Sequence, residues 1–208
     1  MDGAARRARL AHAHLYLIVD ARPHERDPAP LLDAALRGGV DVVQLRDKEL
    51  GDDDLVRAAE PFRRACDEHG ALFVLNDRPD LVAACDADGV HVGQGDATLA
   101  EARRAVGAER LVGLSASAPG ELDAEPDYFG VGAVFGTPTK ADAVTSGLEL
   151  VRAAAARLAI PWFAIGGIDL SNVAEVVAAG APGVAVVRAI RDADDPEEAA
   201  RSLKLHVA

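Results

Sequence analysis

The hydrophobic positions of the chain follow two patterns that alternate almost from end to end. Short runs rich in Val, Ile, Leu and Phe are typical of buried strands, and the Ala-rich stretches between them carry charge on one helical face. The predicted strands are 15–20, 40–46, 72–77, 89–93, 111–116, 128–135, 162–168 and 183–190. The predicted helices are 30–38, 53–70, 79–87, 99–106, 148–159, 171–180 and 195–205.

Eight strands that alternate with helices predict an α/β fold, a single-domain (β/α)₈ TIM barrel. We assign the barrel to residues 14–208 and expect residues 1–13 to be a flexible N-terminal extension. The alternative is an open, doubly wound sheet, because 208 residues is near the lower limit of roughly 200 for the barrel. Between the fifth and sixth strands, residues 118–126 allow little more than one helical turn. The polar, Gly- and Pro-containing loop 136–147 is a candidate lid.

Composition narrows the choice of partners. Half of the residues are hydrophobic, and the net charge of −12 argues against a general nucleic-acid binder, which needs a basic face. No run approaches the roughly 20 apolar residues of a membrane span. The first twenty residues lack a signal-peptide pattern, and Cys66 and Cys85 form no CxxC pair. We therefore expect a cytoplasmic protein that acts on small molecules, with reduced thiols. Anionic ligands would need a local positive site or a metal ion.

The second strand ends in a row of polar residues. Gln44, Arg46 and Lys48 occupy alternate positions and would share one side of an extended segment. In a parallel barrel the carboxyl ends of the strands form the active site, so this row predicts a site for a diphosphate. The alternative is a solvated strand end paired with nearby carboxylates, namely Asp47, Glu49 and Asp52.

Two carboxylates follow neighbouring strands, Asp77 after the third and Asp96 after the fourth. Mg²⁺ prefers one or two carboxylates together with water and phosphate oxygens, so the pair is a candidate magnesium site beside a diphosphate. Alternatively, Asp77 and Asp96 are N-caps of the helices that follow them.

The seventh and eighth strands carry weaker signals. The Gly pair in "AIGGI", 164–168, could hold a phosphate on backbone amides, as barrels often do after these strands, or it could serve tight packing. His91 faces the same way as its strand's glycines, and we interpret it as a core histidine with a hydrogen-bond partner rather than a proton carrier. Tyr16 is interpreted as a packing residue that could reach a ligand ring.

Six stretches in order resemble the thiamine-phosphate synthase family over about residues 15–190. They are "VVQLRDKE", "LFVLNDRPDLVAACDADGVHVGQGD", "LVGLSAS", "YFGVGAVFGTPTK", "WFAIGGID" and "GVAVVRAI". The family is a (β/α)₈ barrel. It joins 4-amino-2-methyl-5-hydroxymethylpyrimidine diphosphate to 4-methyl-5-(2-phosphonooxyethyl)thiazole with Mg²⁺, and it releases pyrophosphate.

The resemblance implies a role for each matching residue. The pyrimidine diphosphate would be held by Gln44, Arg46, Lys48, Asn76 and Lys140, with Ser115 at the pyrimidine. The metal would lie on Asp77 and Asp96. The thiazole phosphate would be held by Thr137, Thr139, Gly167 and the backbone near Val187 and Arg188. Arg46, Lys48, Ser115 and Lys140 are the implied catalytic residues, the partners are phosphorylated small molecules, and a homo-oligomer is compatible with the sequence.

Three positions depart from the family pattern. Arg188 stands where a serine is common, Gly136 replaces a proline, and Ser117 replaces a histidine. A related subfamily of thiazole tautomerases uses a histidine at about the last position, so its absence here favours the transferase. A non-catalytic thiamine-phosphate binding protein is the third hypothesis.

Overall fold

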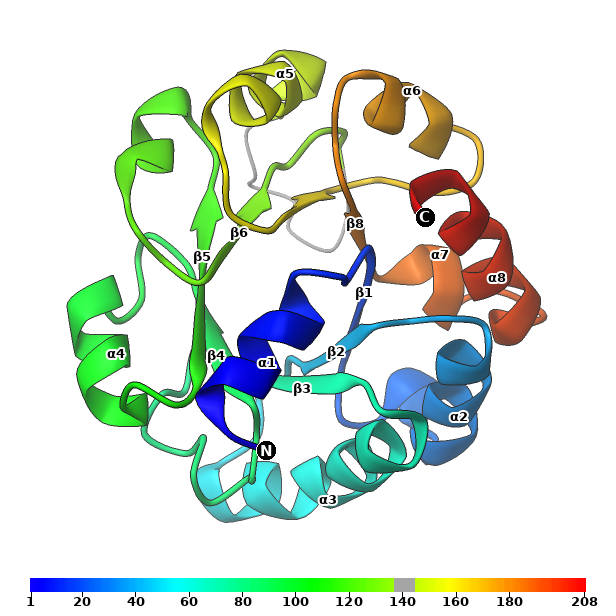
Figure 1. Ribbon diagram of the computed structural model, residues 1–208. Helices are drawn as coiled ribbons and strands as arrows, with labels where there is room; N and C mark the ends of the chain where they lie inside the picture. Colours follow the sequence, from blue (N-terminus) through cyan, green and yellow to red (C-terminus); the bar gives the residue numbers. More distant parts are fainter. Residues whose placement is uncertain (137–144) are drawn as a thin grey trace.

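The computed structural model describes residues 1–136 and 145–208. Its eight parallel strands close into a barrel in chain order, surrounded by helices (Figure 1). The strands are β1 (Leu15–Val19), β2 (Val42–Leu45), β3 (Leu72–Asn76), β4 (Gly89–Val92), β5 (Leu111–Ala116), β6 (Tyr128–Val131), β7 (Trp162–Ile165) and β8 (Val184–Val186). Pairing of Tyr16 with both Val42 and Ala185 closes the ring through β1. The predicted barrel is confirmed, and the open sheet is wrong.

Helices cover the outside of the barrel, and six of the seven predicted helices are among them. They are α2 (Ala29–Arg37), α3 (Asp52–His69), α4 (Leu99–Val106), α5 (Gly147–Arg157), α6 (Val173–Ala178), α7 (Arg188–Arg191) and α8 (Pro196–Val207), with short 3₁₀ helices η1 (Pro23–Glu25) and η2 (Pro119–Asp123). None of the described helices combines the length and apolarity that crossing a bilayer needs. The single turn η2 agrees with the short segment expected before β6.

Strand alternation divides the apolar core into two layers. Residues such as Leu17, Val43 and Phe73 pack outward against the helices, whereas Tyr16, Val42 and Phe163 fill the barrel interior. This two-layer arrangement follows from the period of two along each strand. It also means that a polar residue in the inner layer faces the barrel lumen rather than a helix.

Two predicted elements differ from the structure. Residues 79–86 form turns, not a helix, and positive φ values of 58° at Asp77 and 49° at Asp86 stand just before these turns and at their end. The segment nevertheless buries Val82 and Cys85 as a helix would. The eighth strand ends at Val186, and α7 occupies the rest of the predicted strand.

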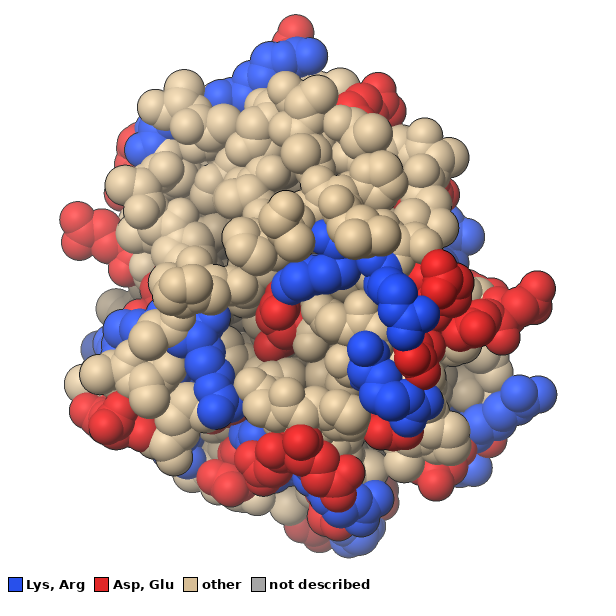
Figure 2. Space-filling view, turned by 45° about the vertical axis from the view of Figure 1, so that its right-hand side comes forward, with Lys and Arg blue, Asp and Glu red and all other residues tan. Residues whose placement is uncertain are grey.

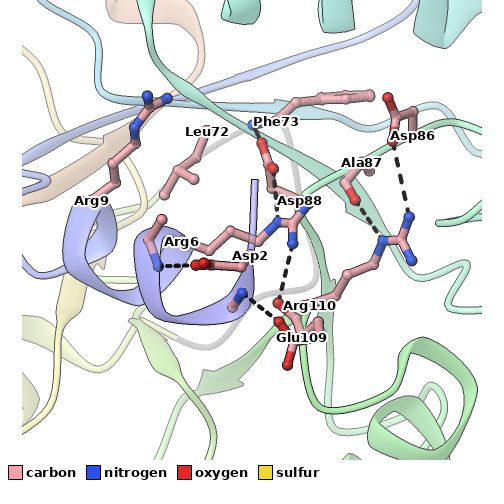
Figure 3. A network of polar contacts seen from close by, with 12 residues as sticks. Asp2, Arg6, Arg9, Leu72, Phe73, Asp86, Ala87, Asp88, Glu109 and Arg110 are labelled. Carbon is pink, nitrogen blue, oxygen red and sulfur yellow. Dashed lines mark hydrogen bonds and ion pairs between the residues drawn. The ribbon is translucent and has the colours of Figure 1, made fainter.

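The N-terminal segment, predicted as a flexible extension, contains helix α1 (Gly3–Leu10), which lies across the amino end of the barrel (Figure 1). Leu10 packs into the inner layer. Arg6 donates from Nε to Asp88 Oδ1 at 2.9 Å (Figure 3), and both side chains are buried. The Arg-rich pattern therefore reflects ion pairing with the barrel rim, which a single sequence does not reveal.

Positive and negative side chains are mixed on the surface of the protein. On the face shown in Figure 2, the described Lys and Arg side chains lie beside Asp and Glu side chains without a continuous basic surface. Cys66 and Cys85 are buried and unpaired, as expected.

Candidate functional site

A cavity of about 1050 Å³ opens at the carboxyl ends of the strands. Every predicted site residue within the described ranges lines it: Gln44, Arg46, Lys48, Asn76, Asp77, Asp96, Ser115, Gly167, Val187 and Arg188. Thr137, Thr139 and Lys140 lie outside the described residues, as does most of the candidate lid 136–147. Residues from six strands and their following loops thus converge on one space.

The cationic side of the cavity comes from the end of β2. Lys48 Nζ lies 3.1 Å from Asp77 Oδ2, and Arg46 makes no ion pair within the described residues. The acids proposed as alternative partners are occupied elsewhere: Asp47 accepts from the backbone amide of Glu49, and Asp52 pairs with Arg78. Within the described residues neither Arg46 nor Lys48 pairs with Asp47, Glu49 or Asp52, although Lys48 is exposed to solvent, so the diphosphate site at this strand end stays a prediction.

Asp77 and Asp96 lie close together in the cavity, next to Lys48. The pKa of Asp77 is raised, chiefly because the carboxyl is partly buried and also because Asp96 lies within hydrogen-bonding range, while Lys48 opposes the rise. Asp96 Oδ2 accepts from the backbone amide of Gly93 at 2.9 Å. Two carboxylates held this closely repel each other unless a proton or a cation lies between them.

The helix-cap interpretation of these two acids is wrong. Helix α4 is capped by Thr98, whose side chain and that of Glu101 form a capping box, and only turns follow Asp77. The pair therefore remains as a candidate metal centre. Within the described residues, no group of three or more His, Cys, Asp or Glu side chains could hold a metal ion, so substrate or water oxygens would have to complete the coordination.

The Gly pair after β7 has structural reasons of its own. Gly166 and Gly167 have φ values of 105° and 63°, which side chains rarely adopt. A Cβ on Gly166 would lie 2.6 Å from Cα of Ala133. Tight packing therefore explains the glycines, and the cavity-lining position of Gly167 leaves the phosphate role as a prediction.

A row of polar side chains that line the cavity, which we call the interior network, crosses the barrel; Gln44, Tyr16 and Tyr128 are buried, whereas His91 and Ser115 are partly exposed. Gln44 Nε2 donates to Tyr16 Oη at 2.8 Å, and Tyr16 Oη lies 3.0 Å from Tyr128 Oη. Tyr128 Oη is 3.3 Å from Nδ1 of His91, whose Nε2 is 2.9 Å from Ser115 Oγ. His91 thus has the predicted hydrogen-bond partners, but it is partly exposed and lines the cavity rather than lying in the core.

The interior network is electrically neutral. Burial lowers the pKa of His91 to about 4, with a smaller opposing effect of Asp96, and burial raises the pKa values of Tyr16 and Tyr128. Strand alternation alone could have shown that the three rings face inward. Their contacts across the barrel depend on the stagger between strands, which the sequence pattern does not specify.

The family model, the curated relatives and the solved structure that we compared with this chain all carry the name of the same enzyme family. A family model described as thiamine monophosphate synthase matches residues 15–190. The thiamine-phosphate synthase of Thermobifida fusca is 48% identical over 204 residues, covering 95% of this chain and 94% of the relative. That of Streptomyces avermitilis is 49% identical over 200 residues, covering 93% of each. The solved thiamine phosphate pyrophosphorylase of Pyrococcus furiosus superposes with a TM-score of 0.86 at 32% identity, covering 95% of this chain and 96% of that one.

Proposed function

The chain belongs to the thiamine monophosphate synthase family, and from this premise we propose how its cavity makes thiamine phosphate. The protein is a transferase with thiamine-phosphate synthase activity, as its relatives and its fold indicate. Its substrates are then a 4-aminopyrimidine carrying a methylene diphosphate and a thiazole carrying a phosphate. The single observation that supports our assignment of roles is the convergence of Arg46, Lys48, Asp77 and Asp96 on one cavity.

Arg46 and Lys48 hold the diphosphate in this proposal. A guanidinium can bind two oxygens at once, and an ammonium adds a movable charge on a flexible stem. Lys48 neutralises part of the charge of Asp77. A cation between Asp77 and Asp96 would replace Lys48 in that role, which would free its ammonium group for the diphosphate.

The donor set fits magnesium. Two adjacent carboxylates, one with a raised pKa, are hard oxygen ligands that gain most from a small divalent cation, and substrate phosphate oxygens can fill further positions. When bound, Mg²⁺ would offset charge on the diphosphate and on the departing pyrophosphate. We propose Asp77 and Asp96 as the residues that hold it.

The bond-breaking step needs no protein nucleophile. The amino group of the pyrimidine can donate electrons as the methylene carbon–oxygen bond breaks, which leaves a cation-like methylene and pyrophosphate. Arg46 and Lys48 stabilise the leaving pyrophosphate, and the thiazole nitrogen then donates its electron pair to the methylene carbon. The family resemblance adds Lys140 to the cationic groups, and Ser115 at the pyrimidine needs no catalytic base.

The thiazole phosphate belongs, in this proposal, at the ends of β7 and β8. Gly167, Val187 and Arg188 line this part of the cavity, and Arg188 makes no ion pair within the described residues. Its guanidinium can therefore add to a phosphate site that the family resemblance assigns to backbone and to Thr137 and Thr139.

We also propose a cytoplasmic location, which the buried, unpaired cysteines fit.

Pyrophosphate release tests the proposal. The protein is incubated with both substrates and Mg²⁺, and release is compared with a reaction that lacks the thiazole. Release that requires both substrates supports synthesis, while tautomer conversion of a thiazole without the pyrimidine would favour the isomerase. Binding of thiamine phosphate in calorimetry with no turnover would leave only the non-catalytic hypothesis. Replacing Mg²⁺ with Mn²⁺ in the same assay identifies the preferred ion.

A further inference from the structure

The main chain takes a sharp and uncommon turn at Asp77, one of the two carboxylates of the candidate metal centre. Asp77 has a φ of 58°, in the left-handed region that residues other than glycine seldom adopt. The backbone amide of Arg78 donates to the carbonyl oxygen of Asn76 at 2.8 Å, which closes a three-residue γ-turn around Asp77. A γ-turn with a positive φ at its centre is rare and strained. The surrounding structure must therefore hold Asp77 in this conformation.

The barrel fixes the start of the turn. Asn76 is the last residue of β3 and pairs with His91 of β4, and the backbone amide of Asp77 donates to the carbonyl oxygen of His91 at 2.9 Å. Rotation about the N–Cα bond of Asp77 leaves both of these contacts intact. The sheet therefore does not by itself select the positive φ, and the chain that leaves the turn must be held by something else.

The side chain of Arg78 holds the end of the turn. Its Nη1 lies 2.8 Å from Oδ1 of Asp52, and its Nε and Nη2 donate to the two carboxylate oxygens of Asp80 at 3.1 and 2.7 Å. Three guanidinium nitrogens thus have carboxylate partners, which fixes the plane of the group. Arg78 also precedes Pro79, which disfavours a helical backbone at Arg78. The outgoing chain is therefore tied down one residue after Asp77.

Of the two acids, Asp52 makes the connection to another element. Asp80 lies two residues from Arg78 and orients the guanidinium within the same segment. Asp52 is the first residue of α3, a helix that packs against β2 and β3 and buries Phe62 completely. The Arg78–Asp52 pair therefore fixes the outgoing chain relative to the barrel. Asp80→Asn would still leave an oxygen for Arg78, so this tie does not depend on the charge of Asp80.

We propose that Arg78 and Asp52 are positioning residues that hold the turn at Asp77 and so keep its carboxylate at the candidate metal centre. This inference rests on the proposed function, which assigns the metal to Asp77 and Asp96. Rotation about the N–Cα bond moves the Cβ of Asp77, so relaxation to a negative φ would swing its carboxylate out of its present place. The two carboxylates would then no longer share one cation.

The Arg78–Asp52 pair should contribute position rather than global stability. The two side chains are 31% and 66% exposed, and ion pairs with this much exposure contribute little to the free energy of unfolding. A structural role and a positioning role therefore differ in a measurable way. Loss of metal affinity without loss of stability is the mark of a positioning residue.

Binding of Mn²⁺ alone, measured as the loss of its free signal in electron paramagnetic resonance, tests the inference without turnover. Arg78→Ala and Asp52→Ala each cut the tie. Asp53→Ala is the matched control, because it removes the same charge from the same first turn of α3, and Asp53 forms no ion pair within residues 1–136 and 145–208. Asp77→Asn shows how much affinity the carboxylate itself supplies. Urea unfolding measures the stability of each variant.

We expect the Kd for Mn²⁺ to rise about tenfold or more in Arg78→Ala and in Asp52→Ala, the range for losing a group that orients a metal ligand. Asp53→Ala should bind Mn²⁺ like the wild type, and the urea midpoints should stay close to that of the wild type.

Two results would overturn the inference and leave the metal assignment in place. One is wild-type affinity in Arg78→Ala and Asp52→Ala while Asp77→Asn binds weakly. The other is a loss in Asp53→Ala equal to that in Asp52→Ala, which would be an effect of charge alone. Weaker binding in step with a lower urea midpoint in both tie variants would mark a structural role and would also overturn it. Wild-type affinity in Asp77→Asn would overturn the metal assignment and the inference together.

Discussion

The clearest energetic consequence of the fold concerns Asp88, a buried carboxylate that joins three elements. Its Oδ1 accepts from Arg6 of α1 at 2.9 Å, and its Oδ2 accepts from Arg63 of α3 at 2.8 Å and from the backbone amide of Phe73 in β3 at 3.0 Å. The Asp88 side chain is 3% exposed. Asp88→Asn preserves the shape but removes the charge that both guanidinium groups face.

We expect Asp88→Asn to lower the free energy of unfolding by about 3 kcal/mol, the low end of the range for breaking a buried ion pair from one side. Arg63 would keep its ion pair with the exposed Asp67 at 2.7 Å, which holds the expected loss at the low end, but its Nε is already a buried atom without a hydrogen-bond partner among the described residues. For a protein of this size the loss corresponds to a melting temperature lower by roughly 6–12 °C. Asp86→Asn is the matched control, since the Asp86 side chain is 77% exposed.

Urea unfolding followed by circular dichroism at pH 7 measures the difference. Burial alone would raise the pKa of Asp88, but the hydrogen bonds from Arg63, Phe73 and Arg6 lower it overall. A lowered pKa means that the stabilisation is fully present above the unfolded-state value of about 3.9 and is lost as the pH falls through the folded-state value. The gap between wild type and Asp88→Asn should therefore shrink in acid. Equal stability of Asp88→Asn and Asp86→Asn at pH 7 would refute this reasoning.

Three further substitutions test the site and its support. Arg46→Ala should reduce kcat/KM for the pyrimidine diphosphate by about 10²–10³ and reduce kcat/KM for the thiazole phosphate less. Steady-state kinetics in which each substrate is varied in turn measures both values. Equal losses for the two substrates would contradict our division of the cavity. Asp77→Asn should raise the Mg²⁺ concentration needed for half-maximal activity by about tenfold or more. Asp80→Asn is the control and should not raise it, because the Asp80 carboxylate pairs with Arg78. Identical metal titrations for the two variants would show that Asp77 is not a metal ligand. Gly113→Ala should lower the free energy of unfolding by about 1–3 kcal/mol, measured by thermal or urea unfolding, because the new Cβ would overlap Tyr128. Gly120→Ala is the control, because a Cβ there meets nothing within 4 Å. Equal stability of the two variants would show that the Tyr128 ring has room to move.

The strands were predictable because each is a short apolar run whose alternate residues face two different apolar layers. Both layers require hydrophobic side chains, so the runs stand out from the amphipathic helices. The helix predicted at 79–87 failed for a related reason: Val82 and Cys85 are buried as a helix would bury them, so the periodicity of apolar residues does not distinguish these turns from a helix.

Long-range polar contacts were beyond the sequence pattern. The arginines of residues 1–13 give no local sign that Arg6 meets Asp88, 82 residues later. Likewise, the inward direction of Tyr16 and His91 follows from alternation, but their connection through Tyr128 depends on how the strands are staggered around the barrel. The site residues at strand ends were easier to predict, because the fold itself brings the carboxyl ends of all the strands to one end of the barrel.

The protein is negatively charged, yet the substrates that we propose for it are polyanions. The charges at the mouth of the barrel explain how it can bind them. A net charge of −12 repels a diphosphate at long range, but salt screens charges on the outer surface beyond about 8–10 Å. Inside the cavity, Lys48 lies 3.1 Å from Asp77, so the nearest charges decide the outcome. Lys48 is a counterion of the acid pair Asp77 and Asp96, and a divalent cation on the pair would free its ammonium group to bind phosphate. Binding of the metal should therefore raise diphosphate affinity by more than direct phosphate–metal contact alone would, because the ion also frees Lys48 from Asp77.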